Sequence, residues 1–333
     1  MVNKGLVNAY TKGLIKITTV MLDKNYCNDV SEVLVTYHPK SELLVAVIQA
    51  VLGQVSDIFI VDNASLNCSF AWLDQFGEQV GTRLHLLKQE ENLGIGAGHN
   101  VGIKLAIALG SKFVMLLDQD SQLQEDVVIR LRTAYYELSN IDGFKVAALG
   151  PQYRDSDTGA LSDFVRVGLG RNHFNFPQNP SVTDADFLVS SGSLLSVAAL
   201  EVVGLMDESL FIDGVDTEWC FRAKSKGFLI VGLYGTVMTH ALGEQRKEIP
   251  WFFRKRAISV HKPFRYYYMY RNSVLLYFRS YTPWGWKFAD MARCCKMAVF
   301  LCWAGENRLD FLKMIGLGII DGLKGVSGRR HDL

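Results

Sequence analysis

A short apolar run that ends in two aspartates constrains the fold of this 333-residue chain more than any other feature. Residues 113–117 read Phe-Val-Met-Leu-Leu, and Asp118, Gln119 and Asp120 follow directly. Such a run predicts a strand buried on both faces of a parallel sheet. Two carboxylates at the end of a buried strand are costly unless a cation or strong donors meet them. We therefore predict that Asp118 and Asp120 bind Mg²⁺ or Mn²⁺, which in turn holds a diphosphate. The alternative is that both aspartates only cap the next helix.

Strand-like and helix-like segments alternate before this run. Residues 31–37, 57–62 and 83–88 are strand-like, and helices are expected over 41–53 and from the stretch 92–102 through residue 109. This alternation predicts an α/β fold with a mostly parallel central sheet flanked by helices. Ligands of such sheets bind beyond the carboxyl ends of the strands. The predicted ligand-contacting residues at these ends are Thr36, Tyr37, Asp62, Asn63, Asn92, Gly94, Gly96, Asn100, Asp118 and Gln119.

The glycine-rich stretch 92–102 is similar to the start of a dinucleotide-binding motif, but it departs from that motif twice. His99 stands at the third glycine position, and the stretch follows the third predicted strand instead of the first. We therefore predict no nicotinamide cofactor. The stretch instead indicates a turn whose backbone approaches a ligand at a helix N-terminus, or a loop that only needs positive φ.

The pattern changes after residue 150. Residues 154–183 are polar and suggest an excursion on the substrate side, and a strand or turn over 187–196 leads into a helix over 197–203. An acidic segment follows, in which Asp213, Asp216 and Glu218 precede or begin a helix. Each of these acids is a candidate catalytic carboxylate or a helix cap. A strand-like run over 229–233 then leads to His240.

The composition excludes several classes of function. The formal net charge is +1, which gives no indication of a nucleic-acid partner. The six cysteines include no Cys-x-x-Cys pair, which favours reduced thiols over a disulfide framework or a zinc site. The N-terminus has no signal-peptide core, and no window is long and apolar enough for a membrane span.

The region after residue 245 is basic and aromatic. Residues 246–279 contain nine Lys or Arg and one acid, Glu248, among many aromatic residues. This composition suits a membrane interface with anionic headgroups, single-stranded nucleic acid, or a packed helical subdomain with a basic face. We expect an N-terminal extension over 1–30, an α/β domain over 31–245 and a helical, membrane-associating C-terminal region over 246–333.

In combination, these motifs resemble the inverting nucleotide-sugar glycosyltransferases of family 2, which have the GT-A fold. More narrowly, they resemble bacterial rhamnosyltransferases of polysaccharide and O-antigen (lipopolysaccharide) assembly. The resemblance covers residues 31–272. It implies a catalytic domain over 31–245, with a nucleotide-binding half over 31–121 and an acceptor-binding half over 122–245. Residues 33–37 are similar to the first nucleotide-contacting strand, 60–65 to the base-recognising strand end with Asp62 beside the pyrimidine, and 92–100 to the glycine loop. Residues 117–121 resemble the metal-binding Asp-x-Asp motif.

The resemblance also assigns roles in the second half. Residues 211–222 are similar to the family's acceptor-side segment, with Val215 in place of the usual Glu and Asp216 in place of the Asp. This implies Asp216 as the general base, with Asp213 and Glu218 as alternatives. His240 is similar to a histidine that meets the metal or the diphosphate, and Arg271 belongs to an Arg-Asn pair near the diphosphate. The alternatives are that His240 is only a histidine of the core and that Arg271 is only one residue of the basic face.

The implied function is transfer of L-rhamnose from dTDP-β-L-rhamnose to a polyprenyl-diphosphate-linked saccharide. The family places this reaction at the cytoplasmic face of the bacterial inner membrane, with peripheral membrane contact and no nucleic acid. Alternatives are another donor such as a UDP-sugar, a sugar nucleotidyltransferase, or a non-catalytic nucleotide-binding module. A nucleotidyltransferase would need a glycine-rich basic loop after the first strand, where this chain has Thr-Tyr-His-Pro at 36–39. The oligomeric state, including a homo-oligomer, is left open.

Overall fold

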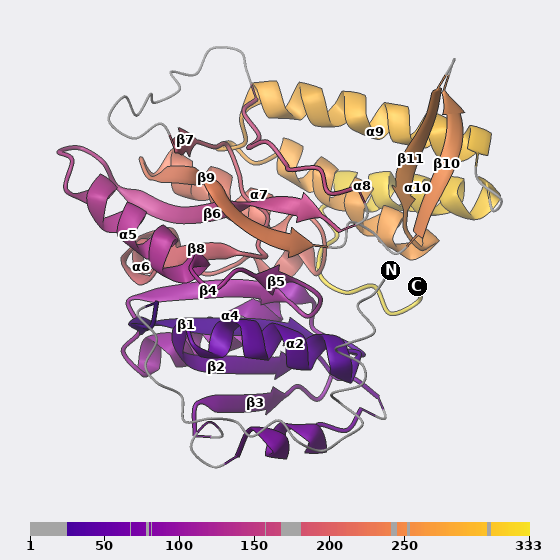
Figure 1. The fold of residues 1–333 in the computed structure, drawn as a ribbon. Helices are drawn as coiled ribbons and strands as arrows, with labels where there is room; N and C mark the ends of the chain where they lie inside the picture. Colours follow the sequence, from indigo (N-terminus) through magenta and orange to yellow (C-terminus); the bar gives the residue numbers. More distant parts are fainter. Residues whose placement is uncertain are drawn as a thin grey trace.

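The computed structural model describes residues 25–333 except 67, 78–79, 81, 157, 168–180, 241–244, 252–253 and 305–307. Most of the expected N-terminal extension therefore lies outside the described residues. The chain forms an α/β fold around a sheet whose strands run in the order β3-β2-β1-β4-β8-β6-β9-β5, with β7 paired to β9 (Figure 1).

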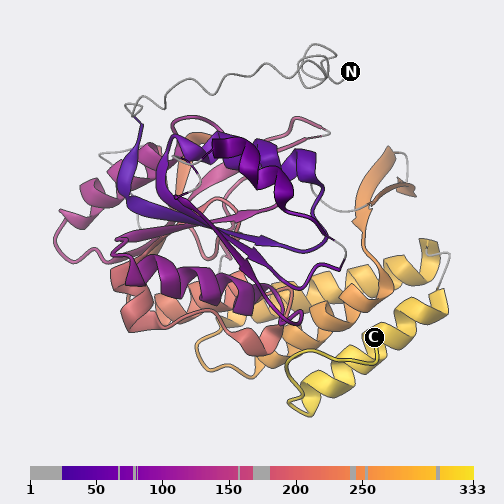
Figure 2. The ribbon, with the colours of Figure 1, turned by 90° about the horizontal axis from the view of Figure 1, so that it is seen from below.

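The first half is a parallel sheet, as predicted. β1 (Cys27–Thr36) pairs in parallel with β2 (Val55–Asp62) and with β4 (Phe113–Asp118), and β2 pairs with β3 (Leu84–Lys88). α2 (Ser41–Leu52) and α5 (Val127–Ser139) cover one face, and α4 (Ile95–Ala108) packs on the other, so that helices flank the sheet on both sides (Figure 2). A short 3-10 helix, η1 (Ala71–Phe76), precedes β3.

The second half is mixed, which corrects the prediction of a mostly parallel sheet. β8 (Ser193–Ser196) is antiparallel to both β4 and β6 (Val146–Asp155), while β9 (Leu229–His240) runs parallel to β6. β5 (Gln122–Leu123) and β7 (Val182–Asp184) are antiparallel to β9. Parallel neighbours need a crossover, usually a helix. The described residues between β6 and β8 form no helix, so β8 returns in the opposite direction.

Short helices follow β8 and lead to residues 211–222. α6 (Val197–Val203) packs against the sheet at β6 and β8. η2 (Glu208–Leu210) then turns the chain, and α7 (Val215–Ser225) lies beside α6. Asp213 has a φ of 65° and Gly214 a φ of 80°. Two successive left-handed residues therefore turn the chain sharply into α7.

The C-terminal region begins with strands, which corrects the expectation of helices throughout 246–333. β10 (Gln245–Trp251) and β11 (Arg254–Val260) form an antiparallel hairpin. α8 (Pro263–Tyr277), α9 (Trp284–Ala304) and α10 (Arg308–Leu323) then pack together (Figure 1). Tyr266, Tyr267, Tyr268 and Tyr270 are all buried in this packing. Much of the aromatic character therefore belongs to a packed subdomain, and none of the described helices is long and apolar enough to cross a membrane.

Candidate active site

A cavity of about 980 Å³ opens at the carboxyl ends of β1, β2 and β4. Parallel strands end at the same edge of a sheet, and the polar residues after them were predicted to meet there. The predicted residues that the structure brings together on this cavity's wall are Thr36, Tyr37, Asn63, Asn92, Gly94, Asp118, Gln119 and Asp120.

Asp62 lies just behind the wall and holds the ends of the first two strands together. The Thr36 hydroxyl donates to Asp62 Oδ1 at 3.2 Å, and the Ser65 backbone N–H donates to Oδ2 at 3.1 Å. The Ser65 hydroxyl also donates to Oδ1, at 2.5 Å. The Asp62 side chain is 3% exposed. These bonds account for a carboxylate at this buried position and order the loop that a nucleotide would contact.

Two asparagines shape the glycine turn. Asn63 Nδ2 donates to Asn92 Oδ1 at 2.9 Å, and the Gly94 N–H donates to the same oxygen at 3.0 Å. Gly94 has a φ of 91°, and a Cβ on it would lie 2.7 Å from Phe211 Cα. Position 94 therefore requires glycine, because positive φ and the close backbone approach both exclude a side chain. The close approach is to the 211 loop of the same chain.

The Asp-x-Asp segment ends β4 at the cavity. The Asp118 N–H donates to Ser191 Oγ at 3.0 Å. Gln119 is bonded in both directions to the Tyr37 backbone, accepting from its N–H at 2.9 Å and donating to its carbonyl at 3.3 Å. These contacts connect β4 to β1 and leave both aspartates on the cavity wall.

The donor set at this point fits a divalent ion that arrives with a nucleotide. Among the described residues no group of three or more His, Cys, Asp or Glu side chains forms a metal cage. Mg²⁺ commonly binds through one or two carboxylates together with phosphate oxygens and water. Asp118 and Asp120 supply such a pair. His240 ends β9, where its backbone pairs with Asp155, and its side chain lies outside the described part of the chain.

Asp216 stands in the first turn of α7 and is half-buried. Its Oδ1 accepts from the Thr217 N–H at 2.7 Å, and its Oδ2 accepts from the Ser190 N–H at 3.2 Å. Burial raises the pKa of Asp216, these hydrogen bonds oppose the rise, and the charge of Asp213 adds to it. A carboxylate with a raised pKa is a better general base near neutral pH.

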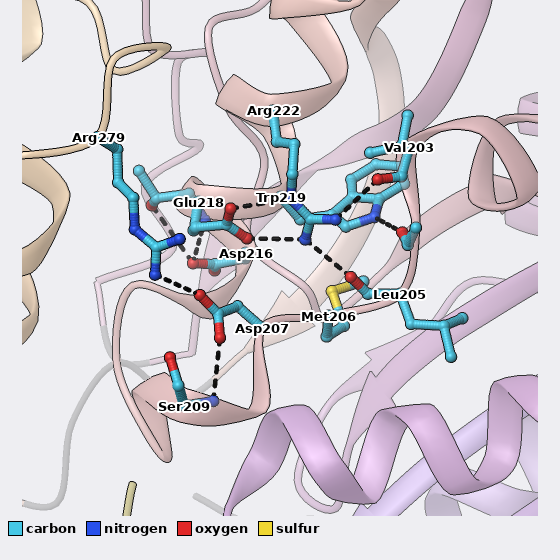
Figure 3. Close-up of polar contacts among 12 residues, drawn as sticks. Val203, Leu205, Met206, Asp207, Ser209, Asp216, Glu218, Trp219, Arg222 and Arg279 are labelled. Atoms are coloured by element: carbon cyan, nitrogen blue, oxygen red, sulfur yellow. Dashed lines mark hydrogen bonds and ion pairs between the residues drawn. The ribbon is translucent and has the colours of Figure 1, made fainter. Parts of the chain in front are cut away.

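Glu218 follows Asp216 by two residues on α7 and therefore lies on a different side of the helix, in a different environment. It is 1% exposed and forms an ion pair with Arg222 at 2.9 Å, and it accepts a short hydrogen bond from the Tyr281 hydroxyl. Arg222 also donates to the carbonyls of Val203 and Leu205 (Figure 3). This network holds α7 against the preceding loop. Glu218 is not among the described residues that line the cavity.

Three other predicted residues also lie behind the cavity wall. Arg271 is fully buried, donates to the Leu210 carbonyl at 2.9 Å and lies over the Tyr268 ring at 4.8 Å. It is therefore neither on an exposed basic face nor on the cavity wall. Asn100 binds the backbone of Met206 and the Glu208 side chain.

Gly96 is the third predicted residue that lies behind the cavity wall. A Cβ on this residue would lie 3.2 Å from the Asp207 carbonyl oxygen and 3.3 Å from Val215 Cγ1. The close contact brings α4 against Asp207 and the start of α7. Together with Asn100 and Arg271, it positions the loop that forms part of the cavity wall.

The opposite wall of the cavity contains residues that sequence reasoning did not assign to a site. The 211 loop, the start of α8 and the last residues of the chain supply this wall. The lining residues from these parts and from two other turns are His38, Ile95, Phe211, Ile212, His261, Lys262, Phe264, Arg265, Tyr268, Arg329, Arg330 and Leu333. The basic and aromatic composition of 246–279 was a usable signal, but the three interpretations given to it were a membrane interface, single-stranded nucleic acid and a packed helical subdomain, and none of them was a ligand site of the sheet.

A second hollow of about 330 Å³ lies on the other side of the 213–214 turn. Asp213, Gly214 and Thr217 line it at the start of α7. Its remaining lining residues are Val165, Val167, Phe187, Met269, Asn272, Ser273, Leu276, Trp286, Ala289, Asp290 and Arg293. Asp216 follows Gly214 by two residues, so a candidate base stands beside this hollow.

Comparison with known proteins identifies the family. The model of the family described as "Glycosyltransferase like family 2" matches residues 17–267. The chain belongs to this family. It is accordingly a glycosyltransferase.

Individual relatives agree with this assignment. The chain is 28% identical over 304 residues to a dTDP-rhamnosyl transferase, RfbF, of Shigella flexneri, covering 90% of this chain and 97% of that protein. It is 24% identical over 223 residues to a low-salt glycan biosynthesis hexosyltransferase of Haloferax volcanii, covering 65% and 66% of the two chains.

Solved structures share the fold. The Staphylococcus aureus TarS fragment 1–349 in complex with UDP-GlcNAc superimposes with a TM-score of 0.55 at 14% identity, covering 90% of this chain and 81% of that one. GalNAc-T7 with UDP, GalNAc and Mn²⁺ gives a TM-score of 0.52 at 14% identity, covering 66% of this chain. This chain spans only 44% of the length of that GalNAc-T7 structure. These likenesses establish the GT-A-like fold.

Proposed function

We propose that this glycosyltransferase transfers L-rhamnose from dTDP-β-L-rhamnose, with inversion, to a hydroxyl of a saccharide acceptor. The observation that carries the proposal is the convergence of Asp118, Asp120 and the Asp62-ordered loop on one nucleotide-sized cavity. The choice of rhamnose is supported by the near full-length similarity to the Shigella flexneri protein. A UDP-linked donor is the second candidate, because the solved structures of similar fold contain UDP or UDP-GlcNAc.

In this mechanism Asp216 removes the proton from the acceptor hydroxyl as its oxygen attacks the anomeric carbon. The new carbon–oxygen bond forms on one face of the sugar while the bond to the β-phosphate oxygen breaks on the other, so a β-linked donor gives an α-rhamnoside. Asp118 and Asp120 would hold a divalent ion against the diphosphate, and such an ion neutralises the charge that develops on the leaving group. The Asp62 network orders the loop beside the nucleobase of the donor. Gln119 connects the ends of β1 and β4.

The 330 Å³ hollow beside α7 is the proposed acceptor site. Its wall combines the rings of Trp286 and Phe187 with polar groups from Thr217, Asp290 and Arg293. Sugars present apolar faces and hydroxyl edges, which aromatic rings and charged hydrogen-bonding groups match. We propose that a lipid-linked saccharide places its accepting sugar there, next to Asp216.

Peripheral membrane contact is proposed for the outer face of α9. Trp284, Phe288, Met291 and Val299 are exposed on this helix, with exposed fractions between 47% and 71%. Lys296 is exposed on the same helix. Exposed aromatic and apolar side chains beside cations suit the headgroup layer of a membrane.

A panel of nucleotide sugars tests the proposed function. The purified protein is mixed with dTDP-rhamnose, UDP-glucose, UDP-GlcNAc or NAD, each with Mn²⁺ and with EDTA, and its melting temperature is measured. We expect the largest stabilisation with dTDP-rhamnose and Mn²⁺, a smaller one with EDTA, and none with NAD. Preference for a UDP-sugar would select the second donor. No stabilisation by any nucleotide sugar would contradict the transferase proposal. Equal shifts with Mn²⁺ and EDTA would contradict the metal site at Asp118 and Asp120.

A further inference from the structure

The end of the chain forms part of the wall of the main cavity. Arg329, Arg330 and Leu333 line the cavity together with Asp118 and Asp120, which are more than 200 positions away in sequence. The segment of residues 324–333, hereafter the C-terminal segment, leaves α10 and runs past the carboxyl ends of the parallel strands (Figure 1). The proposed function assigns no role to this segment.

Specific contacts hold the C-terminal segment in place. The Gly328 N–H donates to the Ser209 carbonyl, and the Gly328 carbonyl accepts from Arg271 Nη1, both at 2.5 Å. The Arg330 N–H donates to the Tyr268 hydroxyl at 2.9 Å. A segment bonded through its backbone to α8 and to the 209 loop has a defined position on the cavity wall.

Arg330 anchors the segment through its side chain. Its Nη1 lies 2.6 Å from Asp321 Oδ2, and its Nε lies 2.8 Å from Asp332 Oδ1. The same Asp321 oxygen accepts from the Tyr267 hydroxyl at 2.7 Å. The positive charge of Arg330 is thus neutralised by two carboxylates, and the side chain positions its neighbours.

Arg329 is different. Its Nη1 donates to the backbone carbonyl of Asn92 at 3.2 Å, across 237 positions of sequence, and in the described part of the chain it pairs with no carboxylate. Lys262, on the same wall, is also without a carboxylate partner there. Arg265, by contrast, is paired with Asp213. Two cations without paired acids therefore face a cavity whose sheet side carries two aspartates.

The positive charges of Lys262 and Arg329 suit an anionic group of the ligand, such as a diphosphate. A nucleotide sugar brings two negative charges on its diphosphate, next to the two negative charges of Asp118 and Asp120. Lys262 and Arg329 add positive charge to the wall that faces these negative groups. Guanidinium groups also bind phosphate oxygens with directed hydrogen bonds.

We propose that the C-terminal segment is part of the donor site and that Arg329 binds the phosphate groups of the nucleotide. Arg330 is a positioning residue, which holds Arg329 at the cavity through Asp321 and Tyr268. This inference rests on the proposed function, since it requires a nucleoside diphosphate as ligand.

Calorimetric titrations of dTDP, dTMP and thymidine into the full chain, with Mn²⁺ present, test the inference. UDP is titrated in parallel. The variants are Arg329→Gln, Arg329→Lys and the control Lys324→Gln, which removes an exposed charge from the same segment outside the cavity lining. We expect Arg329→Gln to weaken dTDP binding about 10- to 100-fold, as loss of a charged hydrogen bond does, and to leave thymidine binding unchanged. Arg329→Lys should retain part of the affinity, and Lys324→Gln should bind as the original protein does.

Hydrogen exchange gives a second, independent measurement. Amides of residues 326–333 should exchange more slowly when dTDP and Mn²⁺ are bound, and this protection should be smaller in Arg330→Gln. Full dTDP affinity in Arg329→Gln, or an equal loss for thymidine and dTDP, would overturn the phosphate role. If the original protein bound neither dTDP nor UDP, the proposed function itself would fail, and that result is visible before any variant is compared.

Discussion

Arg265 and Asp213 form an ion pair between the main cavity and the hollow beside α7. Arg265 Nη2 lies 2.9 Å from Asp213 Oδ1, and Arg265 Nε is within 3.2 Å of both carboxylate oxygens. Arg265 lines the main cavity, and Asp213 lines the hollow beside α7. Asp213 also acts on the candidate base, because its charge adds to the pKa rise that burial causes at Asp216. The pair therefore connects the proposed donor and acceptor sites.

Asp213→Asn should shift the pH dependence of turnover. Removing this negative charge stabilises ionised Asp216, so the pKa of Asp216 falls and the acid limb of the kcat/KM profile moves to lower pH. The measurement is kcat/KM for sugar transfer across pH 4–9 with saturating acceptor. Asp310→Asn, an exposed change on α10, is the control and should leave the profile in place. A limb that stays fixed or moves to higher pH would contradict the coupling.

Asp216→Asn should abolish most turnover while donor binding persists. General-base catalysis contributes about 10²- to 10⁴-fold, and the amide cannot accept the acceptor's proton. We expect kcat to fall by roughly that factor, with the affinity for dTDP and Mn²⁺ unchanged because Asp216 is outside the main cavity. Turnover is followed by release of dTDP, and binding by calorimetry. Asp142→Asn, an exposed surface change, serves as the control.

Two outcomes of the Asp216→Asn experiment separate the alternatives. Near-normal transfer would move the base role to Asp213 or another group. Loss of nucleotide binding together with turnover would indicate that Asp216 belongs to the donor site. A protein that binds nucleotides but shows no transfer even before substitution would be a binding module.

The parallel half of the fold was predictable because its signals are local. The apolar run 113–117 became β4, and the helix expected over 41–53 became α2. Each of these elements is determined by its own burial pattern, and parallel pairing brings the strand ends together. The sequence pattern alone is therefore enough to group the polar residues at these strand ends.

The remaining parts depend on contacts between distant residues. Arg329 meets Asn92, and Arg330 meets Tyr268, 62 positions away. No periodicity or motif encodes such a contact. Arg271 was predicted to lie near the diphosphate, with the basic face as the alternative, but backbone carbonyls and Tyr268 surround it in the fold. The antiparallel insertion of β8 likewise follows from the path of the chain after β6 and has no local signature.

Gly98→Ala should destabilise the protein although alanine favours helices. Gly98 lies in α4 where it crosses β1, and a Cβ there would lie 2.7 Å from Val35 Cγ1. Overpacking of this kind costs about 1–3 kcal/mol, which exceeds the roughly 1 kcal/mol of helix propensity gained. The free energy of unfolding from urea titration measures the net effect.

Gly316→Ala is the matched control for this prediction. Gly316 is in the interior of α10, and a Cβ on it would meet nothing within 4 Å. The propensity term acts alone here, so the variant should be more stable by about 0.5–1 kcal/mol. Similar changes in the two variants would show that close approach of α4 to β1 does not constrain residue 98.

Glu32 should make the stability of the fold fall as pH rises. This residue is fully buried in β1 between Ile58 and Met115, and neither carboxylate oxygen has a hydrogen-bond partner among the described residues. Burial raises its pKa well above the ordinary value of 4.5. The folded protein therefore keeps the proton, whereas the unfolded chain releases it above pH 4.5. Stability from this group is fully present below that pH and is lost as pH rises toward the folded-state pKa.

Glu32→Gln removes this titration. Its free energy of unfolding, relative to that of the original protein, should therefore increase from pH 5 to pH 8, by up to about 1.4 kcal/mol for each pH unit. Urea titrations at pH 5, 6.5 and 8 measure the difference. Glu42→Gln, an exposed change on α2, should show no such trend. A difference between Glu32→Gln and the original protein that stays constant with pH would mean that Glu32 is ionised in the fold, with a compensating group nearby.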